Sequence, residues 1–255
     1  MNLQLNTSVA RGYTSSSQIA RVITENWVEK NSFCPRCGEE KLDRFESNRP
    51  VADFYCTNCY AEYELKSKKD SFTSKIVNGA YNMMIQRINS ENNPHFLFLN
   101  YSSDSLLVQN FLTIPNHYFT NDIIERRSPL SQNARRAGWV GCNILLQNIP
   151  SSGKIFLVKD QNIERKAKVL ENWSKTSFLA KQKVENRGWT IELLKIVEVI
   201  RNNEFELKDV YVFESTLKKK FPQNRFVKDK IRQQLQILRD KGIIKFLGNG
   251  RYVKV

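Results

Sequence analysis

The sequence predicts a mixed α/β (α+β) domain followed by a smaller helical domain that ends in a β-hairpin. Three observations support this fold class. Segments of helical and of strand-type periodicity alternate over residues 1–181, which is typical of a domain built on a central sheet. Two CxxC pairs of cysteines interrupt that alternation near its start. Residues 182–255 show three helical segments and then two β-prone runs around Gly248-Asn249-Gly250, which is a strong hairpin signal.

The first domain is predicted to open with a helix and to continue mainly as strands. Apolar residues recur at helical spacing over residues 16–30, after serines that suit an N-cap. A helix over 61–68 is an alternative to a strand, but the alternation of Tyr63 and Leu65 with charged residues favours the strand. A long basic surface loop is expected over 126–143. Strands are expected over 51–56, 61–68, 95–101, 110–115 and 154–160, with a second helix over 74–90.

The second domain follows a linker near residues 180–188, which divides the chain into domains 1–181 and 182–255. Helices are predicted over 189–201, over 207–221 after a turn at Asn202–Asn203, and over 226–241. Three helices and then a hairpin is the element order of a winged helix-turn-helix, whose third helix enters the DNA major groove.

The charge of the chain favours a polyanionic partner. Its formal net charge is +14, and residues 182–255 alone carry 17 Lys and Arg against 9 Asp and Glu. Lys and Arg that neutralise phosphates release bound counterions, which stabilises a nucleic-acid complex. A solvated basic surface is the alternative. No signal peptide and no run long enough for a membrane span is evident, so a cytoplasmic location without a membrane partner is expected.

Four of the five cysteines have the spacing of a metal site. Cys34 and Cys37 form one CxxC pair, Cys56 and Cys59 the other, with 18 residues between the pairs. Such pairs typically bind zinc tetrahedrally, and four thiolates leave no open position on the metal. The sequence therefore predicts a structural Zn²⁺ site. Cys142 is predicted to be a small buried hydrophobe.

Three charged residues around the second CxxC pair could form a catalytic centre. Glu64 and Lys66 lie two apart on the predicted strand, so they share a face. Asp53 is expected at the end of the apolar strand Val51–Ala52, which Pro50 leads into, across the turn from Glu64. Two carboxylates there could hold Mg²⁺, which would polarise a phosphate, while Lys66 orients the attacking water or neutralises charge. The D-(x)10-E-x-K spacing is weak evidence alone, since charged residues often produce it.

The third helix of the second domain has one apolar and one polar face. Its apolar residues are expected to pack inward: Ile231, Leu235 and Leu238. Glutamine and arginine read adenine and guanine edges, although a merely solvated face is the alternative. The side chains predicted to contact bases are Arg232, Gln233 and Gln236, and those predicted to contact DNA phosphates are Asn224, Arg225, Lys228, Lys230 and, from the hairpin, Arg251.

Three blocks of sequence resemble the DpnI-type methyl-directed restriction endonucleases. The blocks are NRPVADFYCTNC with ELKSKK, ARRAGWVGCNI, and KIRQQLQILRDKGII, in matching order. The resemblance implies a PD-(D/E)xK nuclease core with a structural zinc in residues 1–181 and a winged helix in 182–255. It implies cleavage of double-stranded DNA at GATC containing N6-methyladenine. Asp53, Glu64 and Lys66 match the catalytic motif, although Ala52 stands where the superfamily has proline.

Recognition of a methyl group requires an apolar wall. Trp139, in the basic segment ARRAGWVG, is the candidate in the first domain, with Arg135 and Arg136 beside it for phosphates or guanine. The alternative is that Trp139 belongs to the core, as most tryptophans largely do.

Two main hypotheses follow. The first is a Mg²⁺-dependent, methyl-directed type II endonuclease that acts as a monomer without an obligatory protein partner. The second is a zinc-containing winged-helix regulator whose acids are surface charges and which has no nuclease activity. A nuclease of the same superfamily that acts on branched DNA or other modified bases is a lesser alternative.

Overall fold

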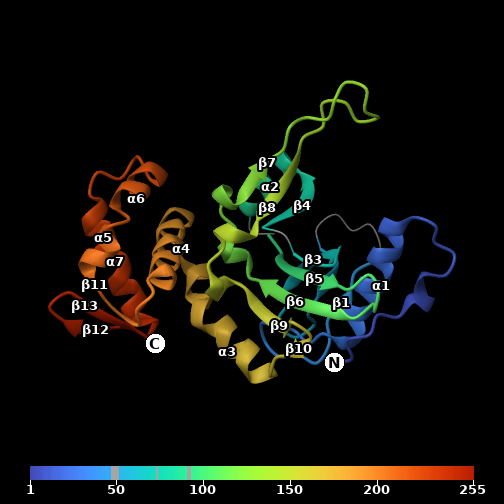
Figure 1. The fold of residues 1–255 in the computed structure, drawn as a ribbon, viewed down its shortest axis with the longest axis horizontal. Coiled ribbons are helices and arrows are strands. Elements are labelled where there is room, and N and C mark those ends of the chain that lie inside the picture. Colours follow the sequence, from blue (N-terminus) through green and yellow to red (C-terminus); the bar gives the residue numbers. More distant parts are fainter. Residues whose placement is uncertain (47–51, 73, 91–92) are drawn as a thin grey trace. The chain divides into compact units, whose positions relative to one another are not determined.

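A computed structural model describes residues 1–46, 52–72, 74–90 and 93–255. The chain divides into two compact units (Figure 1). Unit 1 comprises Met1–Ile149 and Gly153–Ser174, and unit 2 comprises Pro150–Ser152 and Lys175–Val255. The linker predicted over 180–188 instead contains the end of a 3-10 helix (Ser177–Lys181) and the start of helix α4 (Val184–Val199). In the described part of the chain, no helix has the length and apolar composition that crossing a membrane requires.

Unit 1 is built on a seven-stranded sheet of mixed direction. Neighbouring strands run antiparallel except for β3 and β5, which are parallel and therefore need a crossover between them. The strands in sheet order are β1 (Asp43–Arg44), β2 (Phe54–Tyr55), β3 (Glu62–Lys69), β5 (His95–Tyr101), β6 (Val108–Ile114), β9 (Ile155–Lys159) and β10 (Asn162–Ile163). The predicted strands over 61–68, 95–101, 110–115 and 154–160 are confirmed, whereas among the described residues 52–56 only Phe54–Tyr55 form a strand.

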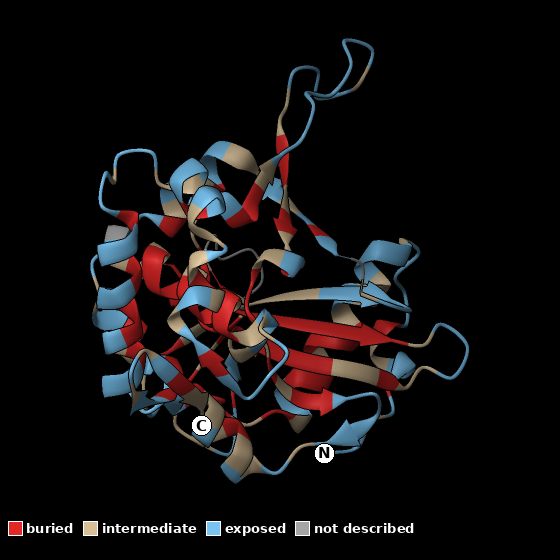
Figure 2. Cartoon of the chain, turned by 60° about the vertical axis from the view of Figure 1, so that its left-hand side comes forward, coloured by how far each residue is buried: buried red, intermediate tan, exposed pale blue. Residues whose placement is uncertain are grey.

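The core of unit 1 lies on both faces of strand β5, all of whose residues are buried (Figure 2). On one face Leu97 and Leu99 join a cluster with Trp27 of helix α1 (Ser16–Asn31), which is the helix expected over 16–30. On the other face Phe96 stacks on Phe119 at a ring distance of 4.5 Å. Burial on both faces explains why the four consecutive residues Phe96 to Leu99 are all apolar.

The crossover from β3 to β5 contains a strand and a helix, so the single helix predicted over 74–90 is wrong in its first half. Strand β4 (Lys75–Ala80) pairs with β8 (Gly141–Leu145), which pairs with β7 (Ile124–Arg126). Helix α2 (Tyr81–Ile88) packs on this second sheet. Pairing with a strand more than sixty positions later overrides local helix propensity, which Gly79 already weakens.

Helix α3 (Lys166–Thr176) was not expected from the sequence. It buries Val169 and Trp173 in the same cluster as α1.

Cys142 is fully buried in β8, as predicted for a small hydrophobe.

Unit 2 contains helices arranged around α7 (Val227–Asp240) and a three-stranded sheet. Ile231, Leu235 and Leu238 are fully buried, which confirms the predicted inner face of α7. The second predicted helix is broken into α5 (Leu207–Tyr211) and α6 (Glu214–Lys220). The predicted terminal hairpin is confirmed as β12 (Ile244–Gly248) and β13 (Arg251–Lys254), and β13 also pairs with the unexpected strand β11 (Glu204–Glu206).

Candidate active site

Strand β3 carries Glu64 and Lys66 on the same face. Side chains alternate along a strand, so Tyr63 and Leu65 point to the opposite face. Lys66 Nζ lies 2.6 Å from Glu64 Oε1, and both side chains are largely buried. Hydrogen bonds to β2 on one side and β5 on the other hold the strand in register. The positions of Glu64 and Lys66 are therefore set by the central sheet.

Asp53 precedes strand β2, which corrects the prediction that an apolar strand ends at this acid. Residue 51 of that predicted strand lies outside the described residues. The Asp53 N–H donates to the Tyr63 carbonyl oxygen at 2.9 Å, and Asp53 Oδ2 accepts a hydrogen bond from the Leu65 N–H at 2.7 Å. These two bonds to β3 fix both the backbone and the carboxylate of Asp53 beside Glu64.

Arg87 of helix α2 is a fourth charged residue beside Asp53, Glu64 and Lys66. Arg87 Nη1 lies 2.5 Å from Glu64 Oε2, while Lys66 occupies the other oxygen, Oε1. The sequence offered no signal for this contact, because Arg87 lies in a helix that packs on a different sheet.

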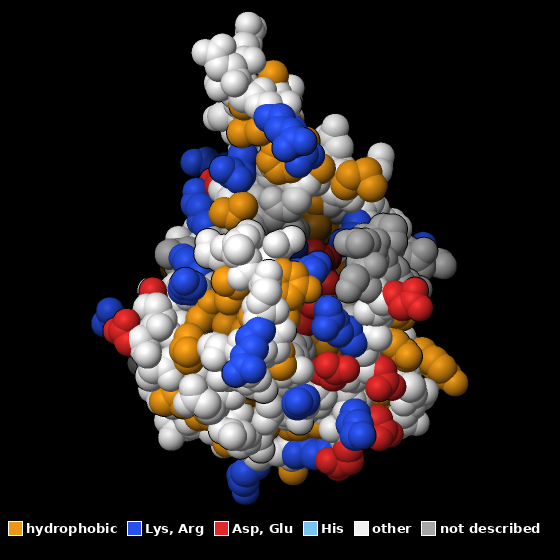
Figure 3. All heavy atoms as spheres, turned by 90° about the vertical axis from the view of Figure 1, so that its right-hand side faces the viewer, with side chains coloured by type: hydrophobic (Ala, Val, Ile, Leu, Met, Phe, Trp, Pro, Cys, Tyr) orange, Lys and Arg blue, Asp and Glu red, His pale blue; other side chains and the backbone are white. Residues whose placement is uncertain are grey.

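The side chains of Asp53, Glu64, Lys66 and Arg87 line one cavity of about 260 Å³. Figure 3 shows the side of unit 1 that carries α1, where acidic side chains sit in a recess beside Lys and Arg. The remaining lining residues come mainly from α1 and β3: Arg21, Thr24, Glu25, Ala52, Leu65 and Ser67. The cavity therefore combines three carboxylates, those of Glu25, Asp53 and Glu64, with cations suited to a phosphate.

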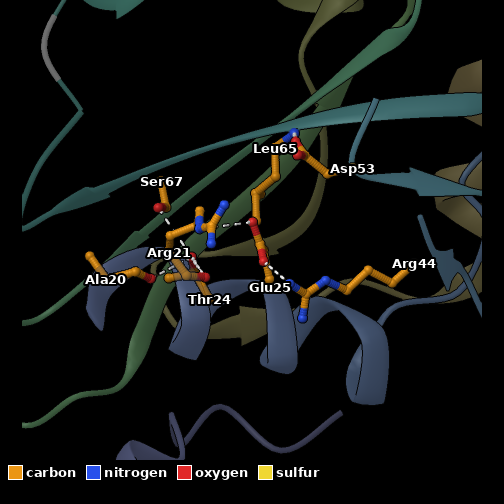
Figure 4. A network of polar contacts seen from close by, with 8 residues as sticks. All are labelled: Ala20, Arg21, Thr24, Glu25, Arg44, Asp53, Leu65 and Ser67. Carbon is orange, nitrogen blue, oxygen red and sulfur yellow. Dashed lines mark hydrogen bonds and ion pairs between the residues drawn. The ribbon is translucent and has the colours of Figure 1, made fainter. Parts of the chain in front are cut away.

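Helix α1 closes one side of the cavity with a network that sequence reasoning missed (Figure 4). Glu25 is only 5% exposed and pairs with Arg44 at 2.5 Å and with Arg21 at 3.8 Å. Thr24 Oγ1 lies 3.1 Å from Ser67 Oγ of β3. An Arg and a Glu four residues apart are common on exposed helices, so the sequence alone did not distinguish this buried pair.

Burial makes the ionised forms of two acids in the cavity costly. Burial raises the pKa of Asp53, and the nearby Glu64 carboxylate raises it further, while the Leu65 N–H, Lys66 and Arg21 act in the opposite direction. Burial also raises the pKa of Glu25. Ionised carboxylates held close together away from water are destabilised unless positive charge compensates them. Asp53 and Glu64 supply the oxygen ligands that Mg²⁺ prefers, so the donor set fits this ion.

The four cysteines of the CxxC pairs converge on one point. All their Sγ atoms lie within 4.8 Å of one another, with Cys34 and Cys59 at 3.7 Å and Cys37 and Cys56 at 3.5 Å. Sulfurs at Zn–S distances of about 2.3 Å in a tetrahedron would be roughly 3.8 Å apart, so the cluster can hold a zinc ion. Burial raises the pKa of the Cys34 thiol to about 11, and a bound cation would offset that cost.

Both cysteine pairs have the same backbone turn. The residue after each pair, Gly38 or Tyr60, has a positive φ, 84° and 57° respectively, and donates its N–H to the carbonyl oxygen of the first cysteine at 2.9 Å. Glycine adopts this conformation readily, whereas tyrosine is strained in it. The same turn therefore forms at both pairs, although at the second pair a tyrosine adopts the strained conformation.

The basic loop predicted over 126–143 runs from residue 127 to residue 140, between β7 and β8, and projects from their sheet (Figure 1). Arg135 and Arg136 are exposed. Trp139 is half-buried at the base of the loop, where its carbonyl oxygen accepts from the Leu130 N–H at 2.9 Å. The Arg136 guanidinium lies 4.7 Å from the Trp139 ring centroid. Trp139 is therefore neither fully exposed nor a core residue.

The residues predicted to read bases lie on the exposed side of α7. Gln233 and Gln236 are exposed. Arg232 is also exposed, but its guanidinium binds the Tyr211 hydroxyl at 2.9 Å and pairs with Asp229. Arg232 would have to exchange these partners in order to reach a base.

The residues predicted to contact phosphates flank α7. Arg225, Lys228 and Arg251 are exposed, with Lys228 Nζ 3.7 Å from Glu214. The remaining two are half-buried and partly engaged: the Asn224 side chain accepts from the Phe226 N–H, and Lys230 donates to Asn186.

Comparison with known families accounts for both units. A sequence model of the Dam-replacing family, DpnI, matches residues 1–182, and the Dam-replacing HTH domain matches residues 185–254. The first match alone covers more than half of the chain. The chain therefore belongs to the Dam-replacing family of DpnI-type methyl-directed endonucleases.

Proposed function

We propose that the protein is a Mg²⁺-dependent type II restriction endonuclease that hydrolyses double-stranded DNA at GATC sites containing N6-methyladenine. The observation that carries this proposal is the arrangement of Asp53, Glu64 and Lys66 around one cavity in a chain of this family. In it, residues 1–181 form a PD-(D/E)xK endonuclease domain with a structural zinc. Residues 182–255 form a winged-helix DNA-binding domain, and the protein acts as a monomer.

Asp53, Glu64 and Lys66 have different roles in the proposed hydrolysis of the phosphodiester bond. Asp53 and Glu64 would hold Mg²⁺, which would supply positive charge that polarises the phosphate. Lys66 orients the attacking water and neutralises the negative charge that develops on phosphorus. The water oxygen bonds to phosphorus as one phosphorus–sugar oxygen bond breaks. The water's proton passes to solvent, and the departing sugar oxygen takes a proton from solvent.

Digestion of one plasmid in two methylation states tests the proposed function. Plasmid with N6-methyladenine at GATC is expected to be cut in Mg²⁺ at every such site. The same plasmid without methylation, or with EDTA in place of Mg²⁺, is expected to stay intact. Agarose electrophoresis reads the fragments. Adenine methylation of the intact plasmid in vitro is the matched control and is expected to restore cleavage. Equal cleavage of both plasmids would contradict the proposed dependence on methylation but would still support the proposed nuclease activity.

The loop tryptophan is proposed to contact the methyl group. Trp139→Ala is expected to lower the preference for methylated over unmethylated GATC by about tenfold, since burying one methyl contributes about 1 kcal/mol and a lost aromatic wall somewhat more. Cleavage rates on both substrates under single-turnover conditions measure the ratio. Tyr13→Ala removes a partly exposed aromatic ring outside the loop and is expected to leave the preference unchanged. An unchanged preference in Trp139→Ala would place methyl recognition elsewhere.

A further inference from the structure

The Glu64 carboxylate is engaged by a cation on each oxygen. Lys66 lies 2.6 Å from Oε1 and Arg87 lies 2.5 Å from Oε2. The exposed fractions of the three side chains are 13% for Glu64, 24% for Lys66 and 20% for Arg87. The three groups are therefore packed together with little water to screen them, and their charges interact strongly.

A divalent cation bound to Glu64 would change this balance. It would bring two positive charges to a carboxylate that already has two cationic partners. One partner therefore has to move for the cation to bind tightly. Lys66 is two residues from Glu64 on the same strand, so the sheet keeps its backbone beside that of Glu64. Arg87 comes from helix α2, which packs on the separate β4-β8-β7 sheet, so it can withdraw without disturbing β3.

Arg87 has space into which it can move. It lines the cavity that contains Asp53 and also a second cavity of about 530 Å³, in which Met83, Met84 and Gln86 of the same helix take part. Glu64 and Lys66 line both cavities too. Arg87 thus stands where the two cavities meet. A guanidinium binds carboxylate and phosphate oxygens with the same forked geometry.

We propose that Arg87 is a two-position catalytic residue. Without a metal it neutralises Glu64, and with metal and DNA bound it contacts a non-bridging oxygen of the scissile phosphate. This inference rests on the proposed function. Arg87 therefore competes with the metal for Glu64 in the free protein, and the DNA phosphate removes that competition. Because binding coupling is reciprocal, metal and DNA bind cooperatively to the wild-type protein.

The substitution Arg87→Gln tests both proposed contacts of Arg87, the one with Glu64 and the one with the scissile phosphate. In the absence of DNA, Arg87→Gln is expected to bind Mn²⁺ about tenfold more tightly than the wild type, since a close, poorly screened cation is removed. Titration followed by the electron paramagnetic resonance of free Mn²⁺ measures this affinity. The single-turnover rate of cleavage at saturating metal is expected to fall ~10²-fold, the usual effect of losing one group that stabilises transition-state charge.

Two further variants serve as comparisons. Arg87→Lys keeps the charge but loses the guanidinium fork, so it is expected to bind Mn²⁺ like the wild type and to cut more slowly. Lys168→Gln removes one positive charge from an exposed pair with Glu171 and is expected to change neither the metal affinity nor the cleavage rate. Circular dichroism of each variant verifies its fold.

Tighter Mn²⁺ binding together with slower cleavage in Arg87→Gln supports the proposal. Metal binding in Arg87→Gln that equals or falls below that of the wild type overturns it, whatever the cleavage rate. If the wild type does not cut methylated DNA, the proposed function fails. The Mn²⁺ comparison still decides whether Arg87 competes for Glu64.

Discussion

Asp53→Asn is expected to abolish DNA cleavage while leaving the protein at least as stable as the wild type. Asparagine keeps the size of the side chain, and its Oδ1 can still accept the hydrogen bond from the Leu65 N–H that Asp53 Oδ2 now accepts. It removes the negative charge that would bind Mg²⁺. Metal-assisted stabilisation amounts to several kcal/mol, so the single-turnover rate should fall about 10³-fold or more. A plasmid-nicking assay with methylated DNA measures the loss.

The stability of this variant follows from the direction of the pKa shift. Burial raises the pKa of Asp53 above its unfolded value of 3.8, so the folded protein binds the proton more tightly than the unfolded chain. The ionised carboxylate therefore destabilises the fold at pH values above the folded pKa. This cost decreases as the pH falls through the folded pKa and is gone below the unfolded pKa of 3.8. Asp53→Asn should melt at the same or a higher temperature than the metal-free wild type at pH 7. The difference should narrow towards pH 4.

Asp104→Asn is the matched control, since Asp104 is an exposed aspartate of the same unit. It is expected to cut at the wild-type rate. Binding of methylated DNA by Asp53→Asn in Ca²⁺, followed by gel shift, is expected to persist. If Asp53→Asn cuts methylated DNA as fast as the wild type, Asp53 does not belong to the catalytic centre, and the zinc-containing regulator becomes the better explanation of the sequence.

Local patterns in the sequence were sufficient where the structure depends on local interactions. The inner face of α7 follows from apolar residues at helical spacing, and the terminal hairpin follows from Gly248-Asn249-Gly250, whose residues all have positive φ values. The convergence of the cysteines follows from the two CxxC pairs. In each case residues close in sequence determine the outcome, so periodicity and turn chemistry contain the information.

Elements that depend on distant partners could not be predicted in this way. Residues 75–80 have a helical pattern but form β4 because β8, much later in the chain, provides hydrogen-bonding partners. The same limit applies to the site. Asp53, Glu64 and Lys66 lie within fourteen positions and could be grouped from the sequence, whereas Glu25 and Arg87 reach the cavity from separate helices. Their role depends on packing that no local pattern records.

Removal of zinc is expected to have the largest effect on unit 1. Metal binding in small zinc sites contributes on the order of 10 kcal/mol to folding. Here the cysteines hold the turn that joins Asp53 to Glu64. Cys56 follows Asp53 by three residues, and Tyr63, next to Glu64, has its hydroxyl 3.2 Å from Cys34 Sγ. Cys59→Ala is therefore expected to lose both its zinc and its cleavage activity, even in excess Mg²⁺.

Zinc content by atomic absorption and unfolding by calorimetry measure the effect. The transition of unit 1 should move to a much lower temperature in Cys59→Ala, whereas the α7 core of unit 2, which contains none of the four cysteines, should melt as in the wild type.

Cys142→Ala supplies the matched control, because Cys142 is a buried cysteine outside the cluster. It should retain one zinc per chain and its cleavage activity. The comparison separates loss of a metal ligand from loss of a buried thiol. If Cys59→Ala lost zinc but still cut methylated DNA at the wild-type rate, the hydrogen bonds of Asp53 to Tyr63 and Leu65 would suffice to position the acids. In that case zinc would stabilise the fold without shaping the active site.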